Sequence, residues 1–124
     1  MTTEQLKLRT KGMALRVIRL VSTLPYSRES DVIGRQLLRS ATSVGANYRA
    51  ACKARSRADF ISKIGIVEEE ADETLYWLEL LSESKMVKAD SIEDLIKEVR
   101  ELVAIFTASG KTAKRGVGKK VDHS

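Results

Sequence analysis

The sequence is poor in the residues that build disulfides, metal centres and tight turns: its 124 residues include one Cys, one His, one Pro and seven Gly. The single cysteine, Cys52, excludes a disulfide within the chain and fits a reduced thiol in the cytoplasm. The single histidine excludes most histidine-based metal sites and catalytic triads. So few Gly and Pro argue against turn-rich all-β folds. We expect a helical protein that is not an enzyme and uses no cofactor.

Long hydrophobic runs and aromatic residues are also scarce. No basic stretch followed by an apolar segment stands near residue 1, and no window of about 18 residues is apolar throughout, so we expect no signal peptide, no membrane contact and a cytoplasmic protein. Aromatic residues make up 5% of the chain. On the predicted helices, we expect Tyr48, Tyr76 and Trp77 to pack in the core or at a subunit interface rather than to stack on bases.

The sequence does contain apolar residues at spacings of three and four. The longest such stripe runs from Phe60 to Leu81 at near-heptad spacing. The pattern predicts an all-α protein, an antiparallel up-down-up-down four-helix bundle formed by residues 1–110. The predicted helices span about residues 5–24, 31–54, 57–83 and 91–109.

The predicted helix ends depend on Pro, Ser and Gly. Pro25 ends the first helix, because proline has no amide donor, and either Ser27 or Ser30 caps the second without completing a full capping box. Gly45 inside the second helix predicts tight packing or a local bend, since glycine costs about 1 kcal/mol relative to alanine there. Gly110 is predicted to stop the fourth helix, which leaves residues 111–124 as a disordered, flexible basic tail.

Charge is divided unevenly along the chain, although the formal net charge is only +5. Residues 1–65 hold 13 basic and 4 acidic side chains, residues 66–109 hold 4 and 12, and residues 110–124 hold 5 and 1. Three arrangements fit this division: neutralisation between helices, a face that binds nucleic acid, or a face that binds a protein partner.

The basic side chains of the first two predicted helices, and those just after them, form the candidate nucleic-acid-binding set. Arginine predominates among them, and it binds phosphate in a bidentate manner but also makes strong salt bridges between subunits. The set therefore fits both uses. Its members are Lys7, Arg9, Lys11, Arg16, Arg19, Arg35, Arg39, Arg49, Lys53, Arg55 and Arg57.

Three apparent catalytic or binding motifs lack residues that their chemistry requires. Gly110-Lys111-Thr112 resembles the end of a P-loop, but Ile105 stands where the first glycine is needed. Ser82-x-x-Lys85 matches a nucleophile pattern with nothing nearby to stabilise an oxyanion, so it is interpreted as a helix terminus. The acidic residues within 68–73 lack the histidines of di-iron bundles, and an oxygen-only Mg²⁺ or Ca²⁺ site is a remote alternative to a solvated or inter-helix face.

Three stretches together resemble a known family. They are residues 36–48 (Gln-Leu-Leu-Arg-Ser-Ala-Thr-Ser-Val-Gly-Ala-Asn-Tyr), 60–63 and 70–78. The chain resembles the bacterial four-helix bundle protein family, which includes proteins encoded in intervening sequences of some bacterial 23S rRNA genes. It is also similar to the accessory variability proteins of diversity-generating retroelements.

The resemblance implies a homopentameric ring without catalytic residues. In the retroelement members it implies a basic surface that engages nucleic acid and a reverse transcriptase, so RNA, DNA and, by distant analogy, such an enzyme are the implied partners. This sequence has Ala50 where the family usually has Glu. The family motif, which we interpret as structural, maps here onto Gln36, Arg39, Asn47, Glu70 and Glu73.

The leading hypothesis is a non-enzymatic oligomer that binds RNA or DNA without sequence preference through the basic set. The alternative is a protein-binding adaptor whose basic and acidic faces form the subunit interfaces. An enzyme that uses the acidic residues with Mg²⁺ is a distant third hypothesis.

Overall fold

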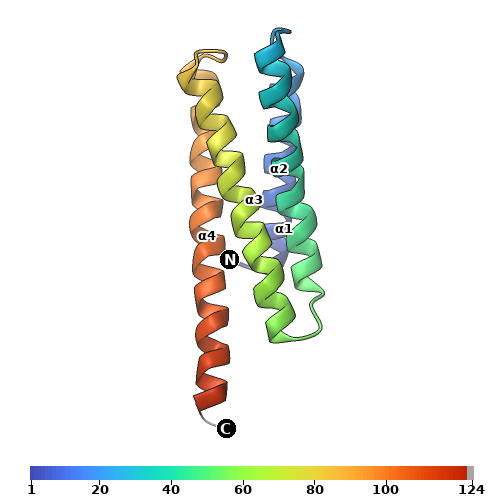
Figure 1. The fold of residues 1–124 in the computed structure, drawn as a ribbon, viewed down its shortest axis with the longest axis vertical. Coiled ribbons are helices and arrows are strands. Elements are labelled where there is room, and N and C mark those ends of the chain that lie inside the picture. Colours follow the sequence, from blue (N-terminus) through green and yellow to red (C-terminus); the bar gives the residue numbers. More distant parts are fainter. Residues whose placement is uncertain (123–124) are drawn as a thin grey trace.

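The protein is an antiparallel bundle of four α-helices (Figure 1). The computed structural model describes the backbone of residues 1–122 and the side chains of residues 1–116. The predicted fold class is confirmed. The helices are α1 (Thr3–Ser22), α2 (Arg28–Cys52), α3 (Arg57–Glu83) and α4 (Ala89–Asp122).

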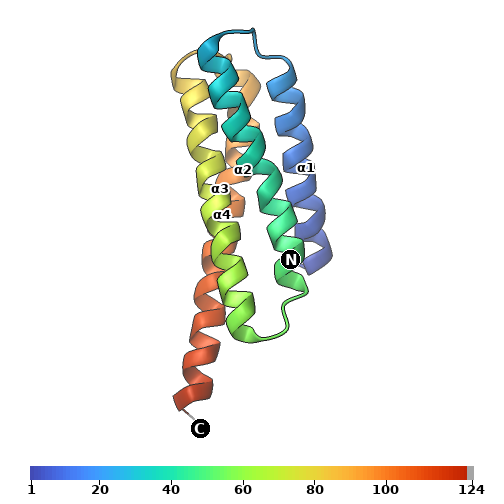
Figure 2. The same cartoon turned by 45° about the vertical axis from the view of Figure 1, so that its right-hand side comes forward.

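Helices that follow one another in the sequence lie side by side in the bundle (Figures 1 and 2). α2 packs against both α1 and α3, and α3 packs against α4. α1 also touches α4, but much less extensively, and α4 continues well past the start of α1 (Figure 2). One end of the bundle therefore has four helices around its axis, whereas α3 and α4 extend alone at the other.

The apolar stripes predicted from the sequence form one core. Met13, Leu37, Ile64, Leu78 and Phe106 are buried almost completely. Each helix contributes a row at spacings of three and four, as expected for a stripe that faces a bundle axis. The stripes therefore predicted most of the buried faces correctly, whereas Phe60, at the start of the longest stripe, is only half-buried.

α1 and α2 approach closely where α2 has small residues. A Cβ at Gly45 would lie 3.2 Å from Thr10 Oγ1, a distance tighter than ordinary van der Waals contact. The Thr10 hydroxyl is held in place, since it donates to the carbonyl oxygen of Leu6 at 3.0 Å. The tight packing predicted at Gly45 is confirmed, without a break in the helix.

The start of α2 corrects the predicted capping. Ser27 is the N-cap, and its hydroxyl accepts from the Ser30 amide while the Ser30 hydroxyl accepts from the Ser27 amide, each at 3.0 Å. The prediction that neither serine completes a capping box was wrong, because a serine can serve where Glu or Gln is usual. Ser30 lies within the first turn, so α2 begins three residues earlier than predicted.

The prediction that α4 stops at Gly110 was wrong. α4 begins at Ala89 and continues to Asp122. No glycine in the described region has a positive φ, so Gly110 does not adopt the left-handed conformation of a helix stop. It is buried against α3 instead, where an added Cβ would lie 3.7 Å from Ile64 Cγ2. The predicted disordered tail is therefore helical through residue 122, and residues 123 and 124 lie outside the described residues.

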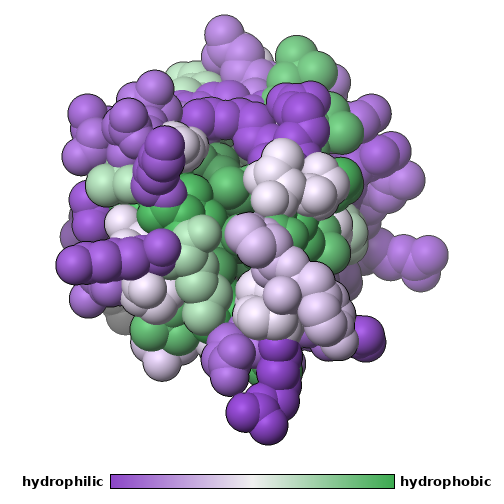
Figure 3. Space-filling model, turned by 90° about the horizontal axis from the view of Figure 1, so that it is seen from above, coloured by the Kyte–Doolittle hydropathy of each residue, from purple (hydrophilic) through white to green (hydrophobic). Residues whose placement is uncertain are grey.

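The end that holds the α1–α2 and α3–α4 connections is closed by apolar side chains. Leu24, Met86 and Val87 pack against the core there. Figure 3 looks onto this end and shows apolar residues inside a hydrophilic rim. Lys85, two residues after α3 ends at Glu83, has a φ of 64° and is the left-handed residue of the α3–α4 connection. In the described part of the chain, no helix is both long and apolar enough to cross a bilayer.

Candidate nucleic-acid interface

Two arginines of the predicted basic set form ion pairs between helices. Arg9 on α1 holds Glu98 of α4 through its Nε at 3.0 Å and reaches Glu101 at 3.2 Å. The hydrogen bond with Glu98 raises the pKa of Arg9, and burial opposes this. Arg9 is therefore engaged in joining α1 to α4.

Arg39 joins α2 to α3 in the same way. Its guanidinium pairs with Glu70 at 3.0 Å and with Glu73, and its Nε donates to the Gln36 amide oxygen at 3.4 Å. Four of the five family-motif residues therefore meet in one network. The fifth, Asn47, lies apart and donates to the Ser43 carbonyl oxygen of its own helix at 2.8 Å.

Lys7 and Arg35 make ion pairs within their own helices. Lys7 Nζ lies 3.3 Å from a Glu4 oxygen, and Arg35 Nε lies 3.1 Å from an Asp31 oxygen. Exposed pairs of this kind contribute only about 0.2–1 kcal/mol and exchange readily with other anions.

A groove between α1 and α2 collects three members of the set. Lys7, Lys11 and Arg49 line it, and its volume is about 460 Å³. The small side chains that let α1 and α2 approach each other, among them Gly45 and Ala46, form its floor. Glu4 also lines the groove and pairs with Lys7, whereas Lys11 and Arg49 form no ion pair with the described residues, so the groove carries a net positive charge.

Arg16 and Arg19 lie away from this groove. Arg16 follows Arg9 by seven residues, which places it on the edge of α1 that faces α4. Arg19 lies on the outward face of the same helix. The eleven predicted residues therefore do not form a single patch.

The remaining members lie where α2 gives way to α3, next to the part of α4 that was predicted to be a tail. Arg57 lies against α4 so closely that a Cβ at Gly116 would collide with its guanidinium. We call the exposed cations of these segments the basic end, and in the described region none of them forms an ion pair. The basic end comprises Lys53, Arg55, Arg57, Lys111 and Arg115, whereas Lys114 lines a separate hollow together with acidic residues of α3.

A carboxylate near the basic end is already engaged. Asp59 accepts a hydrogen bond from Lys63 at 2.6 Å. This bond lowers the pKa of Asp59, with a smaller contribution from Arg55. Asp59 therefore neutralises the basic end only in part.

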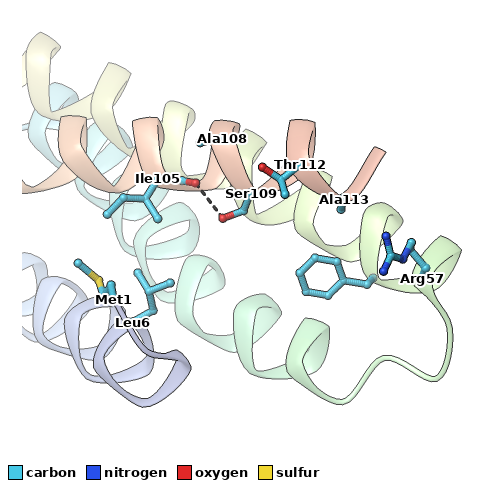
Figure 4. A pocket seen from close by; sticks show the side chains of 9 residues that line it. Met1, Leu6, Arg57, Ile105, Ala108, Ser109, Thr112 and Ala113 are labelled. Carbon is cyan, nitrogen blue, oxygen red and sulfur yellow. Dashed lines mark hydrogen bonds between the residues drawn. The ribbon is translucent and has the colours of Figure 1, made fainter. Parts of the chain in front are cut away.

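An apolar cleft of about 830 Å³ opens beside the basic end, and we call it the end cleft. Arg57 stands at one side of it in Figure 4, and residues of α1 and α4 form other parts of the wall. Ser109 donates its hydroxyl hydrogen to the Ile105 carbonyl oxygen at 2.9 Å (Figure 4). The residues that line the end cleft are Met1, Leu6, Arg57, Phe60, Ile105, Ala108, Ser109, Thr112 and Ala113.

The end cleft was missed because it depends on the length of α4. The sequence pattern places Phe60 in a core stripe, but the structure leaves it half-buried at the cleft. The signal that could have revealed the site is the continued helical spacing of Phe106, Gly110 and Ala113 beyond the supposed stop.

The acidic residues of α3 face different neighbours. Glu70 and Glu73 pair with Arg39, whereas Glu68 accepts from the Thr107 hydroxyl on α4 at 3.1 Å. Over the described residues, no group of three or more His, Cys, Asp or Glu side chains is placed to hold a metal ion. These carboxylates serve contacts between helices.

The aromatic residues and the cysteine occupy the core and the surface. Tyr48 is buried beside Phe106, with ring centroids 5.3 Å apart. Burial raises the pKa of Tyr48, and a hydrogen bond with Cys52 adds to the effect. Trp77 donates to Glu73 at 3.3 Å, and its neighbour Tyr76 is exposed. Cys52 is half-buried against the core.

Comparisons with known proteins agree with this architecture. A family model described as 23S rRNA-intervening sequence protein matches residues 4–108. A solved structure, a protein of unknown function from the S23 ribosomal protein family of Bacteroides thetaiotaomicron, is 37% identical, with a TM-score of 0.78 over 85% of this chain and 97% of that one. No curated protein matches. Because the family model covers most of the bundle, the chain belongs to the 23S rRNA-intervening sequence protein family.

Proposed function

We propose that this protein binds the phosphate backbone of RNA or DNA, without sequence preference, through the α1–α2 groove and the basic end. One contrast supports the proposal. Arg9 and Arg39 are engaged with carboxylates of other helices, whereas Lys11, Arg49 and Lys53 form no ion pair with the described residues. Cations left without carboxylates on an exposed surface attract polyanions.

The groove and the basic end are joined along α2. Arg49 lines the groove, and Lys53 follows it by four residues, which places the two on one side of the last turn of α2. Arg55 and Arg57 continue from Lys53 into α3. A nucleic-acid backbone that lies along this row of side chains would contact one cation after another, from Arg49 to Arg57.

The test measures affinity against salt concentration. A fluorescein-labelled 20-nucleotide RNA and a duplex DNA of equal length are titrated with the full chain at 50 and 200 mM salt, by fluorescence anisotropy. The triple variant Lys11→Ser, Arg49→Ser, Lys53→Ser is compared with a matched control, Lys85→Asn, Lys88→Ser, Lys97→Ser, which removes the same charge elsewhere. The control uses Asn at position 85 because Asn tolerates a left-handed backbone.

The expected result is a steep loss of affinity with salt in the wild-type chain. For duplex DNA, the groove variant should lower the slope of log affinity against log salt by about 2 to 3, because each lost phosphate contact removes about 0.9. The control variant should keep the wild-type slope. Binding that is indifferent to salt, or equal losses in both triple variants, would contradict the proposal.

We propose self-assembly as a second function, because two outward helix faces are apolar and oppositely charged. Leu8, Leu15 and Ile18 are exposed on α1 near Arg19, whereas Ile66 and Tyr76 are exposed on α3. Glu69 shares that outward face of α3. Contact between the α1 face of one copy and the α3 face of the next is heterologous and can close into a ring. The homopentamer that the resemblance implies would be a ring closed by such contacts, and it is part of this second proposal.

Light-scattering mass on a sizing column tests the assembly. The wild-type chain is expected to elute as a particle of several subunits, and Leu15→Asp with Ile18→Asp is expected to yield monomers. A matched control, Val32→Asp, changes an exposed apolar residue of α2 and is expected to keep the wild-type mass. A monomeric wild-type chain, or an unchanged mass in the double variant, would contradict this second proposal.

A further inference from the structure

We propose that the end cleft holds an unpaired base of single-stranded nucleic acid while the basic end contacts the adjoining phosphates. This inference rests on the proposed function and assigns it a strand preference. It is carried by one juxtaposition: the apolar cleft, with Phe60 in its lining, opens beside cations that form no ion pair in the described region.

The lining of the end cleft suits the flat face of a base. Its walls are apolar, and no carboxylate lines it within the described residues. Phe60 is half-buried, so part of its ring stays accessible. Base–aromatic stacking of this kind tolerates any base, because every base has a π-face.

Two hydroxyls give the cleft a polar edge. The Ser109 hydroxyl donates its hydrogen to Ile105, so its oxygen is left to accept a hydrogen bond. Thr112 lines the same cleft, and its hydroxyl can either donate or accept. An amino or carbonyl group at the edge of a base can bind here in several orientations, which agrees with binding that has no sequence preference.

The charges at the rim suit phosphate. Arg57 lines the cleft and lies across α4 at Gly116, the residue type that leaves room for it. Ala108, Thr112 and Arg115 follow one another at spacings of four and three, so Arg115 stands on the same edge of α4 as two lining residues. Two cationic side chains at one rim repel each other, and a bound anion relieves this repulsion.

The size of the cleft and the spread of charge favour a single strand over other ligands. A volume of about 830 Å³ falls within the range of small-molecule sites. A base can enter only when it is unstacked and unpaired, as in single strands and loops. A fatty acid would also match an apolar cleft with a cation, but its one carboxylate leaves the cations at Lys53 and Arg55 without a ligand, whereas a strand supplies successive phosphates.

The test compares single strands with duplexes. The full chain is titrated with a fluorescein-labelled 15-nucleotide oligouridine and with an RNA duplex of the same length. Phe60→Leu keeps an apolar side chain in the cleft but removes the ring, and Tyr26→Leu removes an exposed ring from the α1–α2 connection, at the other end of the bundle, as the matched control. Melting followed by circular dichroism verifies that both variants are folded.

Phe60→Leu should weaken binding of the single strand by about fivefold or more, in line with the loss of one stacked base. Its duplex affinity should stay within about twofold of the wild type. Tyr26→Leu should change neither affinity. A second measurement needs no variant: an oligonucleotide with one 2-aminopurine should change its fluorescence on binding the wild-type chain, and decanoate should not reverse that change.

The possible failures are distinguishable. Equal effects of Phe60→Leu and Tyr26→Leu, or an unchanged 2-aminopurine signal, would overturn the cleft assignment while salt-dependent duplex binding kept the proposed function. Binding that does not respond to salt would overturn the proposed function itself. Decanoate binding that depends on Phe60, with no effect of Phe60→Leu on the single strand, would assign the cleft to acyl chains and also overturn the inference.

Discussion

The α2–α3 seam and the basic end use the same residue type in opposite ways. At the seam, the guanidinium of Arg39 is placed between Glu70 and Glu73, so its charge holds two helices together. At the basic end, Arg57 lies over Gly116 and forms no ion pair with the described residues. Because the register between helices decides which arginine meets a carboxylate, the same side chain is structural in one place and free to bind in the other.

The comparison also shows why a count of charge along the chain is a poor map of the surface. Residues 66–109 are strongly acidic, but Glu70, Glu73 and Glu98 face arginines of the basic half. Neutralisation between helices and free positive charge are therefore both present. They occur on different sides of the same helices, as Arg9 and Lys11 show on α1, and at different levels of the bundle.

The largest expected effect separates the core from the end cleft. Phe106→Ala should lower the free energy of unfolding by about 3–5 kcal/mol, because Phe106 is completely buried beside Tyr48. Phe60→Ala should cost clearly less, since Phe60 is half-buried at an open cleft. Urea titration of both variants measures the difference. Equal losses would mean that the end cleft belongs to the core.

A smaller effect, on stability and on RNA affinity, distinguishes Arg39 from Arg57. Arg39→Ala should lower stability by about 1 kcal/mol, because it breaks a partly exposed ion-pair network, and should leave RNA affinity nearly unchanged. Arg57→Ala should show the reverse pattern, with wild-type stability within about 0.5 kcal/mol and a salt slope lower by about 1. The same urea and anisotropy titrations apply. An affinity loss in Arg39→Ala as large as in Arg57→Ala would contradict the assignment of Arg39 to structure and of Arg57 to binding.

The smallest effect tests the helix that runs into the basic end. Gly110→Ala should stabilise the protein by about 0.5–1 kcal/mol, because alanine favours the helix and its Cβ would make only ordinary contacts, at 3.5 Å from Glu68 Oε2 and 3.7 Å from Ile64 Cγ2. The melting temperature should rise accordingly. Destabilisation would indicate that Gly110 ends the helix after all.

The fold could be predicted because a bundle depends on periodic information. The stripes through Leu6, Met13, Leu37 and Leu78 repeat at helical spacing, and their buried faces follow directly. The end of α4 could not be predicted by the same means, because a glycine is a stop signal only where its backbone turns left-handed, and packing against Ile64 keeps Gly110 helical.

The site was predicted only as a list of cations. Sequence spacing places Arg39 and Arg49 on α2, but only the register with α1 and α3 determines that one meets carboxylates and the other lines a groove. The end cleft needed still more information, since its walls come from three helices and from a part of α4 beyond residue 108, where the family match ends. Such a site arises from the relative lengths and positions of helices, and the helical spacing that continues beyond Phe106 signals the length of α4 but not its position against α1 and α3.

The unequal helix lengths have a consequence for how the molecule opens. At 1.5 Å per residue, α4 with its 34 residues is about 20 Å longer than α1 with its 20. Gly110 is the last buried residue of α4 among those whose side chains are described, so residues 111–116 can unwind locally with little exposure of the core. We therefore expect folding cooperativity to end near Gly110, and any ligand that orders the next turns of α4 does so at a free-energy cost that is separate from the stability of the bundle.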